Sequence, residues 1–128
     1  MMRLVAVVLL SISLFAQAPL RLAEVRKIYI EKMPGSFDQY LRLSILKTFR
    51  DRVTIVLDKS MADAILNQVY MGAQSKKATV NLTDKHGNVI LWSGSAGDRE
   101  EKFLWLKHGG EQKMADNLAD QLKDAMEH

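Results

Sequence analysis

The sequence contains no cysteine, and this absence excludes two classes of small protein. A disulfide-stapled scaffold needs cysteine pairs, and the common structural zinc sites need cysteine thiolates. The chain also has only 2 prolines, both isolated, and its 7 glycines stand singly or in one pair. Because linkers, low-complexity tracts and repeats are compositionally biased or periodic, we expect no internal division and therefore one domain.

The sequence has no apolar run of the length that crosses a membrane, which is about 20 residues. The longest run, from Leu4 to Ala16, follows Arg3 and leads into small residues up to Ala18. This order is typical of a cleavable export signal. We expect residues 1–18 to be removed after Ala18, leaving residues 19–128 as a periplasmic or secreted bacterial domain without a transmembrane segment. A buried amino-terminal strand is the alternative, and no cysteine lies there to carry a lipid anchor.

The rest of the chain has the composition of an ordinary globular domain, since 48% of the residues are hydrophobic and 26% are charged. Between residues 25 and 33, Ile28 and Ile30 alternate with polar neighbours, which predicts a half-buried strand. Ser36 and Gln39 then have the spacing of a capping box, in which two side chains satisfy free amides at the start of a helix. We therefore expect a helix to begin at Ser36.

That helix is predicted to be amphipathic, because an apolar residue recurs at every fourth position. The apolar stripe consists of Phe37, Leu41, Ile45 and Phe49, with Leu46 beside them. Arg42, Lys47 and Arg50 face elsewhere on the same helix. These three basic residues are candidates for a surface that binds an anionic partner.

Strand patterns dominate the middle of the chain. Residues 53–57 are rich in β-branched side chains, which predicts an inner strand. Residues 64–71 fit either a strand or a helix, and a strand is slightly favoured. Residues 78–83 and 89–93 are joined by a short loop in which Gly87 supplies a positive φ, so they predict a β-hairpin.

The last third of the chain is predicted to contain an irregular crossing over residues 94–108 and then a second amphipathic helix from Glu111. The apolar stripe of this helix consists of Met114, Leu118, Leu122 and Met126, with Ala115 and Ala119 alongside. The whole order is β-α-β-β-β-β-α. It predicts an α+β two-layer sandwich, with a mainly antiparallel sheet and both helices on one face.

No catalytic or metal-binding pattern is found in the sequence. The three histidines do not have metal-ligand spacing; they are His86, His108 and His128. Some carboxylates are close enough in sequence for acid/base chemistry, but turn formation and helix capping explain them more simply. They are Asp58, Asp63, Asp98, Glu100 and Glu101. We expect no catalytic residue, no cofactor, no metal and no enzymatic activity.

Two features favour a binding surface. Between Arg21 and Arg52 the sequence has eight basic and four acidic residues, and such a field attracts anionic partners, although it also fits a solvated helix face. Residues 103–106 form an aromatic-rich segment around Trp105, flanked by lysines. This segment is either a contact patch with an aromatic anchor or a lid over the core.

The run Ala62-Asp63-Ala64-Ile65-Leu66, which follows the predicted second strand, resembles a step found in small envelope proteins. These include lipopolysaccharide-assembly lipoproteins that plug an outer-membrane barrel, activator lipoproteins of penicillin-binding proteins, and the amino-terminal domain of the TolB translocation protein. The resemblance implies a domain that binds rather than catalyses. It also implies that Ala62 and Ala64 are small for packing and that Asp63 fixes the turn. Unlike those lipoproteins, this chain lacks the lipidated cysteine.

The sequence therefore favours a non-enzymatic periplasmic binding or envelope-assembly accessory domain. Its expected partner is an envelope protein or an anionic glycolipid, not nucleic acid, and the expected contacts are Arg42, Lys47, Arg50 and Trp105. A self-associating structural module, and with less support a small hydrolase, are the alternatives.

Overall fold

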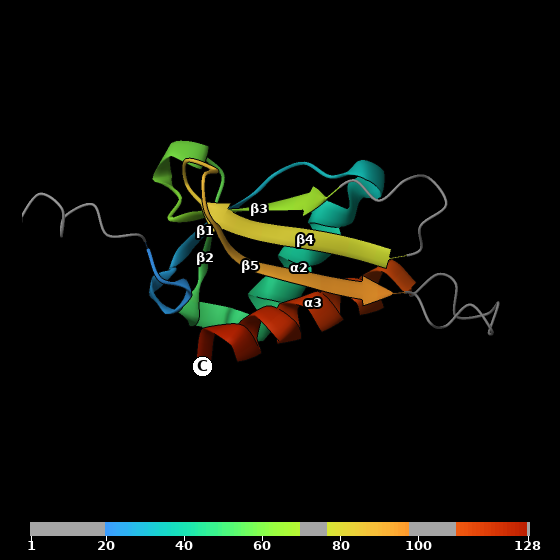
Figure 1. The fold of residues 1–128 in the computed structure, drawn as a ribbon. Coiled ribbons are helices and arrows are strands. Elements are labelled where there is room, and N and C mark those ends of the chain that lie inside the picture. The colour runs from blue at the N-terminus through green and yellow to red at the C-terminus, as the bar shows by residue number, and fades with distance from the viewer. Residues whose placement is uncertain (1–19, 70–76, 98–109, 128) are drawn as a thin grey trace, which may run out of the picture.

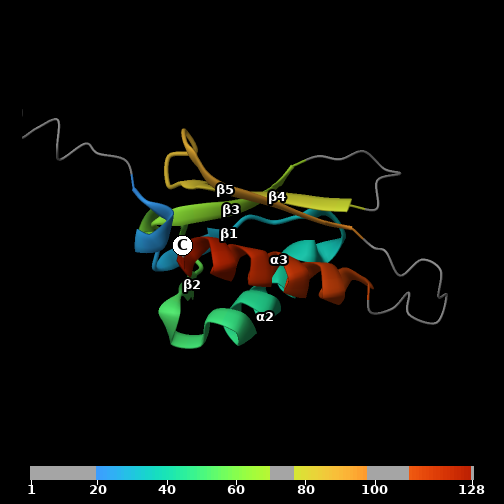
Figure 2. The ribbon, with the colours of Figure 1, turned by 60° about the horizontal axis from the view of Figure 1, so that its bottom comes forward.

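The computed structural model describes residues 20–69, 77–97 and 110–127 of the chain. In this part, five strands form one sheet, and two α-helices lie together on one of its faces (Figures 1 and 2). The elements are β1 Lys27–Ile30, α2 Phe37–Phe49, β2 Thr54–Val56, β3 Ala64–Val69, β4 Lys77–Asp84, β5 Ile90–Gly97 and α3 Gly110–Glu127. Short 3-10 helices connect them, at η1 Leu22–Glu24, η2 Pro34–Ser36, η3 Arg50–Arg52 and η4 Lys59–Met61. The predicted α+β class and the order β-α-β-β-β-β-α are confirmed.

The sheet has the strand order β2-β1-β3-β4-β5 and is mixed. β1 pairs in parallel with β2 and β3, and α2 lies in the connection that carries the chain from β1 to β2. The longer ladders, β3 with β4 and β4 with β5, are antiparallel. The β4–β5 hairpin is confirmed, and Gly87 has the expected positive φ of 72° in its turn.

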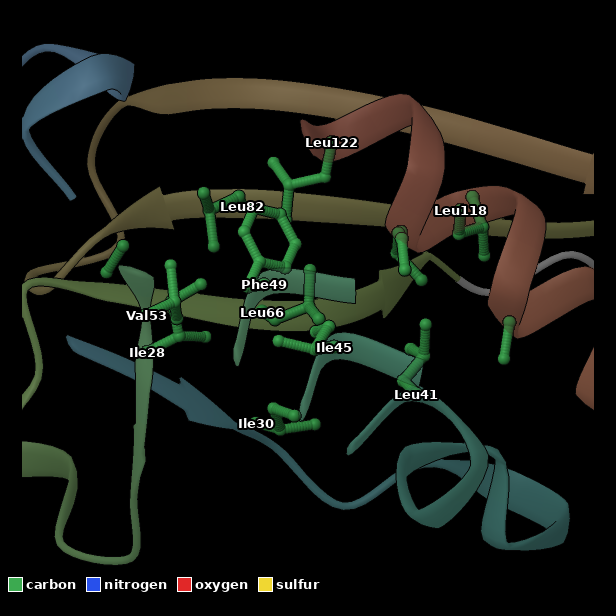
Figure 3. Packing of buried hydrophobic residues seen from close by; sticks show 14 of the residues in the cluster. Ile28, Ile30, Leu41, Ile45, Phe49, Val53, Leu66, Leu82, Leu118 and Leu122 are labelled. Carbon is green, nitrogen blue, oxygen red and sulfur yellow. The ribbon is translucent and has the colours of Figure 1, made fainter. Parts of the chain in front are cut away.

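The core lies between the sheet and the two helices (Figure 3). Ile28 of β1, Leu66 of β3 and Leu82 of β4 point from the sheet toward the helices, as the two-residue period of a strand requires. The stripes predicted for both helices are buried, apart from the half-buried Met114. Burial of these side chains is the main favourable term in the stability of the fold.

The expected capping box at Ser36 is wrong. Ser36 has a φ of 60°, in the left-handed region, and its side chain makes no capping hydrogen bond. A side-chain N-cap of this kind normally has an extended backbone. Instead, Oδ1 of Asp38 accepts a hydrogen bond from the backbone amide of Met33 at 3.2 Å and ties the first helical turn to the preceding loop.

Three other expectations need correction. The strand at residues 53–57 is an edge strand, because β1 takes β3 as its other partner, and Leu57 after it is 82% exposed. Leu46 is 46% exposed, because one step of about 100° beyond Ile45 turns its side chain toward solvent. Residues 94–97 continue β5 instead of opening an irregular crossing, since their small side chains still pair with β4. The rest of that crossing, and the predicted signal peptide, lie outside the described residues.

Candidate binding surface on α2

The solvent side of α2 carries exposed apolar side chains and basic side chains, the two features expected of a contact surface with an anionic partner. Opposite the buried stripe, Leu43 is 61% exposed and Leu46 is 46% exposed. Arg42 and Lys47 stand next to these leucines on the helix, and Arg50 follows its last residue, Phe49. We call these five residues the α2 outer face.

The helical period explains how these side chains are grouped. At about 100° per residue, the four positions within α2 fall within roughly 140° of the helix circumference, and Arg50 follows the last residue of the helix. Arg42 and Lys47 lie at the two borders of this arc, and the leucines lie between them. The α2 outer face is therefore an apolar centre with a basic rim, which is the general anatomy of a contact surface.

The three basic residues differ in how they are held. The ammonium of Lys47 lies 3.2 Å from Oδ1 of Asp116 on α3, yet the Lys47 side chain is 67% exposed. Arg42 and Arg50 make no ion pair and no side-chain hydrogen bond with the described residues. The Nε atom of Arg42 is buried against the protein without such a partner. Two guanidinium charges of this surface are therefore not neutralised within the described part of the domain.

Arg50 also has an unusual backbone. At the end of α2 it adopts φ 52° and ψ −114°, a combination that matches the first central position of a type II′ turn. Glycine is the residue favoured at that position, because a side chain there is strained. Arg50 therefore costs stability at a place where its charge is presented to solvent.

A polar cluster links the inner side of α2 to α3. Ser44 is fully buried, and its hydroxyl donates to Oδ1 of Asp116 at 2.6 Å. Gln112 donates to the Ser44 hydroxyl at 2.8 Å and to the same Asp116 oxygen at 3.2 Å. Burial raises the pKa of Asp116, but the hydrogen bonds it accepts outweigh burial and hold the pKa below its ordinary value.

This cluster has no signal in the local sequence, because Ser44 and Asp116 are 72 residues apart. It resembles the start of a catalytic constellation, since a serine hydroxyl faces a carboxylate. A nucleophile must reach its substrate, however, and the Ser44 side chain is buried between the helices. The cluster fixes how α2 packs on α3 and thereby orients the α2 outer face.

The carboxylates considered for acid/base chemistry have structural partners. Asp58 caps η4 by accepting from the backbone and side chain of Ser60, and these hydrogen bonds lower the pKa of Asp58. Oδ2 of Asp63 accepts from the amides of Arg26 and Lys27, each at 2.9 Å, and so ties the entry to β3 onto the start of β1. Both side chains stabilise connections and leave no free pair for proton transfer.

The remaining candidates give no site in the described part of the chain. His86 lies in the β4–β5 turn, and within residues 20–69, 77–97 and 110–127 no group of three or more potential ligands could hold a metal ion. Other candidates fall outside the described residues: Trp105, His108, His128, Asp98, Glu100 and Glu101. Neither described helix is long and apolar enough to span a membrane. Ala62 and Ala64 are both buried, as the resemblance to envelope proteins implied.

Comparison with known proteins gives structural likeness only. No family model and no curated protein sequence matches the chain. Among solved structures, the chain is similar to uncharacterized lipoprotein B from Nitrosomonas europaea, with a TM-score of 0.47 and 12% identity over 80% of this chain and 83% of that one. It is also similar to a minor lipoprotein from Acinetobacter baumannii, with a TM-score of 0.45 and 13% identity over 80% of this chain and 90% of that one. These similarities are to small bacterial lipoproteins and assign no function.

Proposed function

We propose that this domain is a non-enzymatic binding module of the bacterial cell envelope, and that the α2 outer face docks on a surface of anionic lipid headgroups. The observation that carries the proposal is the pair of exposed leucines, Leu43 and Leu46, framed by basic side chains on one side of one helix. The export signal expected over residues 1–18 supports the location.

Charge complementarity favours an anionic partner. Arg42 and Arg50 have no acidic partner among the described residues, and Lys47 keeps most of its side chain in solvent. Each basic residue held close to an anionic bilayer contributes about 1 kcal/mol to binding. Guanidinium groups also match phosphate geometry, because they donate two parallel hydrogen bonds.

The leucines favour a lipid surface over a purely polar polyanion. An amphipathic helix at a membrane surface buries its apolar side chains at the headgroup boundary while its basic residues contact phosphates. Leu43 and Leu46 are placed for such insertion, and their partial exposure in water costs free energy that insertion would recover. A soluble polyanion would leave both leucines in water.

Co-sedimentation with vesicles tests the proposal. The chain from Pro19 onward is mixed with vesicles of phosphatidylglycerol and phosphatidylcholine, or of phosphatidylcholine alone, at low and high salt. Binding is expected only with phosphatidylglycerol and should weaken as salt screens the charges. The double variant Arg42→Gln/Arg50→Gln should bind roughly thirtyfold more weakly, because two contributions of about 1 kcal/mol are lost.

A matched control is available on α3. Lys113→Gln/Lys123→Gln removes the same charge from the other helix, so equal loss in the two double variants would mean a general charge effect and would contradict docking through α2. Leu43→Ser/Leu46→Ser separates insertion from charge attraction, and unchanged binding in that variant would count against a lipid surface. Retention of an envelope protein without any vesicle binding would replace the lipid by a protein partner.

A further inference from the structure

The two edges of the sheet differ in length and chemistry. β2, at one edge, has three residues, and the charged residues Arg52 and Asp58 stand two positions before and after it. β5, at the other edge, has eight residues with no charge and no proline. Natural sheets usually protect a free edge with charges, proline or a very short strand. β2 fits that rule and β5 does not, apart from a bulge near its start.

The hydrogen-bond geometry shows which groups of β5 face outward. Nε2 of Gln121 on α3 donates to the backbone oxygen of Ser95 at 2.9 Å. Because successive residues of an edge strand direct their backbone groups alternately toward and away from the neighbouring strand, Ser93 and Gly97 face outward together with Ser95. No strand in the described part of the chain pairs with these groups. Gln121 satisfies one of them.

The position of α3 decides what kind of partner fits this edge. α3 packs against β5, as both views of the ribbon show (Figures 1 and 2). If two folded copies paired antiparallel through β5, about a two-fold axis perpendicular to the sheet, their α3 helices would lie on the same face, roughly one strand spacing of about 4.8 Å apart. Packed helices need about 8–10 Å between their axes. A second folded copy is therefore a poor fit, and an extended segment that carries no helix of its own is a good one.

Side chains along β5 leave room for such a segment. Ser93, Ser95 and Gly97 are small and exposed on the open face of the sheet. On the helix side, the ring of Trp92 lies so close to Gly94 that a Cβ there would come within 2.4 Å of it. Gly94 therefore leaves room for the half-buried Trp92 ring, which packs against the core on the helix side of the sheet.

We infer that the outer edge of β5 is a docking site for an extended, uncharged segment of another protein, which adds a sixth strand to the sheet. Backbone hydrogen bonds to Ser93, Ser95 and Gly97 hold the segment. Gln121 covers the Ser95 oxygen in the free domain and is displaced on binding. This site is separate from the α2 outer face, so either proposal stands if the other fails.

The probe is a capped peptide with the sequence of β5 itself, residues 90–97, because it carries no charge and no helix. It is titrated into the ¹⁵N-labelled chain from Pro19 onward. Amide exchange should slow at Ser93, Ser95 and Gly97, whose N–H groups face outward, and should change little at Gly94 and Ala96, which already pair with β4. Absence of binding, or slowed exchange confined to other residues, would overturn the inference.

Proline substitutions locate the site. Ser95→Pro removes an outward N–H and leaves the ladder to β4 intact, so the domain should fold but bind the peptide at least about tenfold more weakly. Ser93→Pro serves as a second variant if Ser95→Pro does not fold. Gln121→Ala exposes the Ser95 oxygen and should strengthen binding roughly fivefold. A gain of affinity cannot come from misfolding.

The choice of occupant has its own test. Sedimentation of the chain without peptide should show no dimer that depends on Ser95. A dimer that Ser95→Pro abolishes would show that a second copy occupies the edge, and would overturn the inference.

Discussion

α2 and α3 pack against the sheet in the same way, but their solvent-facing sides differ. Each helix buries an apolar stripe against the same face of the sheet. Outside, α2 exposes Leu43 and Leu46 beside basic residues, whereas none of the described large apolar residues that are exposed lies on α3. The exposed side chains of α3 are Glu111, Lys113, Asn117, Asp120, Asp124 and Glu127. Because burial constrains only the inner stripe, the chemistry of the outer side is free to serve binding, and α2 is the helix that departs from an ordinary solvated face.

The largest expected effect separates an inner from an outer leucine. Leu118→Ala, on the buried side of α3, should lower the free energy of unfolding by about 2–5 kcal/mol, because it removes packed atoms and leaves a cavity. Leu46→Ala, on the outer side of α2, should change it by only about 0.5 kcal/mol. Urea denaturation of both variants measures the difference. Equal losses would show that Leu46 is part of the core and would remove the basis for a docking surface.

The next effect concerns the polar cluster between the helices. Asp116→Ala leaves the buried Ser44 hydroxyl without its acceptor and should cost about 1–3 kcal/mol in unfolding free energy. The folded state lowers the pKa of Asp116, so its contribution is complete above the unfolded-state pKa of about 3.9 and is lost as the pH falls through the lower folded-state value. The stability difference between wild type and variant should therefore be constant near neutral pH and shrink in acid.

The exposed Asp120 on the same helix provides the control for this pH dependence. Asp120→Ala removes one carboxylate from α3, as Asp116→Ala does, but its side chain makes no hydrogen bond or ion pair with the described residues. It should leave the unfolding free energy nearly unchanged at neutral pH. A loss as large as that of Asp116→Ala would mean that helix charge, and not the buried cluster, holds α2 on α3.

Local patterns were sufficient to predict the elements, because burial imposes its period on the sequence. The four-residue spacing of Leu41 and Ile45 and the glycine at position 87 each predicted their structure correctly. The position of a strand in the sheet is a long-range property. The β-branched run at residues 53–57 predicted a strand, but its place at an edge depends on β1 also pairing with β3.

The candidate site could be predicted only in part, because the packing of one helix on another is also a long-range property. Charge alone indicates the basic residues of this surface, whereas the pattern places Leu46 beside the buried stripe and does not distinguish Leu43. Whether an apolar residue beside the stripe of α2 is covered depends on where the neighbouring helix packs. That helix is α3, which begins more than 60 residues later in the sequence. Ser44 and Asp116 meet only once both helices are placed.

A smaller effect tests whether α2 gives up stability for binding. Arg50→Gly should raise the unfolding free energy by about 1 kcal/mol, since glycine adopts the Arg50 backbone conformation without strain. The same change should weaken binding to phosphatidylglycerol vesicles about fivefold, because one basic contact is lost. Denaturation of this variant should therefore show a gain in stability, and co-sedimentation of the same variant should show a loss of vesicle binding. Unchanged vesicle binding would mean that the strain at Arg50 serves only the turn.

The smallest effect on stability compares one lysine from each helix. Lys47→Gln breaks an ion pair with Asp116 in which the lysine is 67% exposed, so solvent screening should keep the loss of unfolding free energy below about 0.5 kcal/mol. Lys113→Gln, on the solvent side of α3, should be neutral. Vesicle binding should separate the two variants more clearly than stability does, because only Lys47 lies on the α2 outer face. If both lysine substitutions weakened vesicle binding equally at low salt, binding would depend on the net charge of the domain. The difference between the outer sides of α2 and α3 would then have no part in recognition.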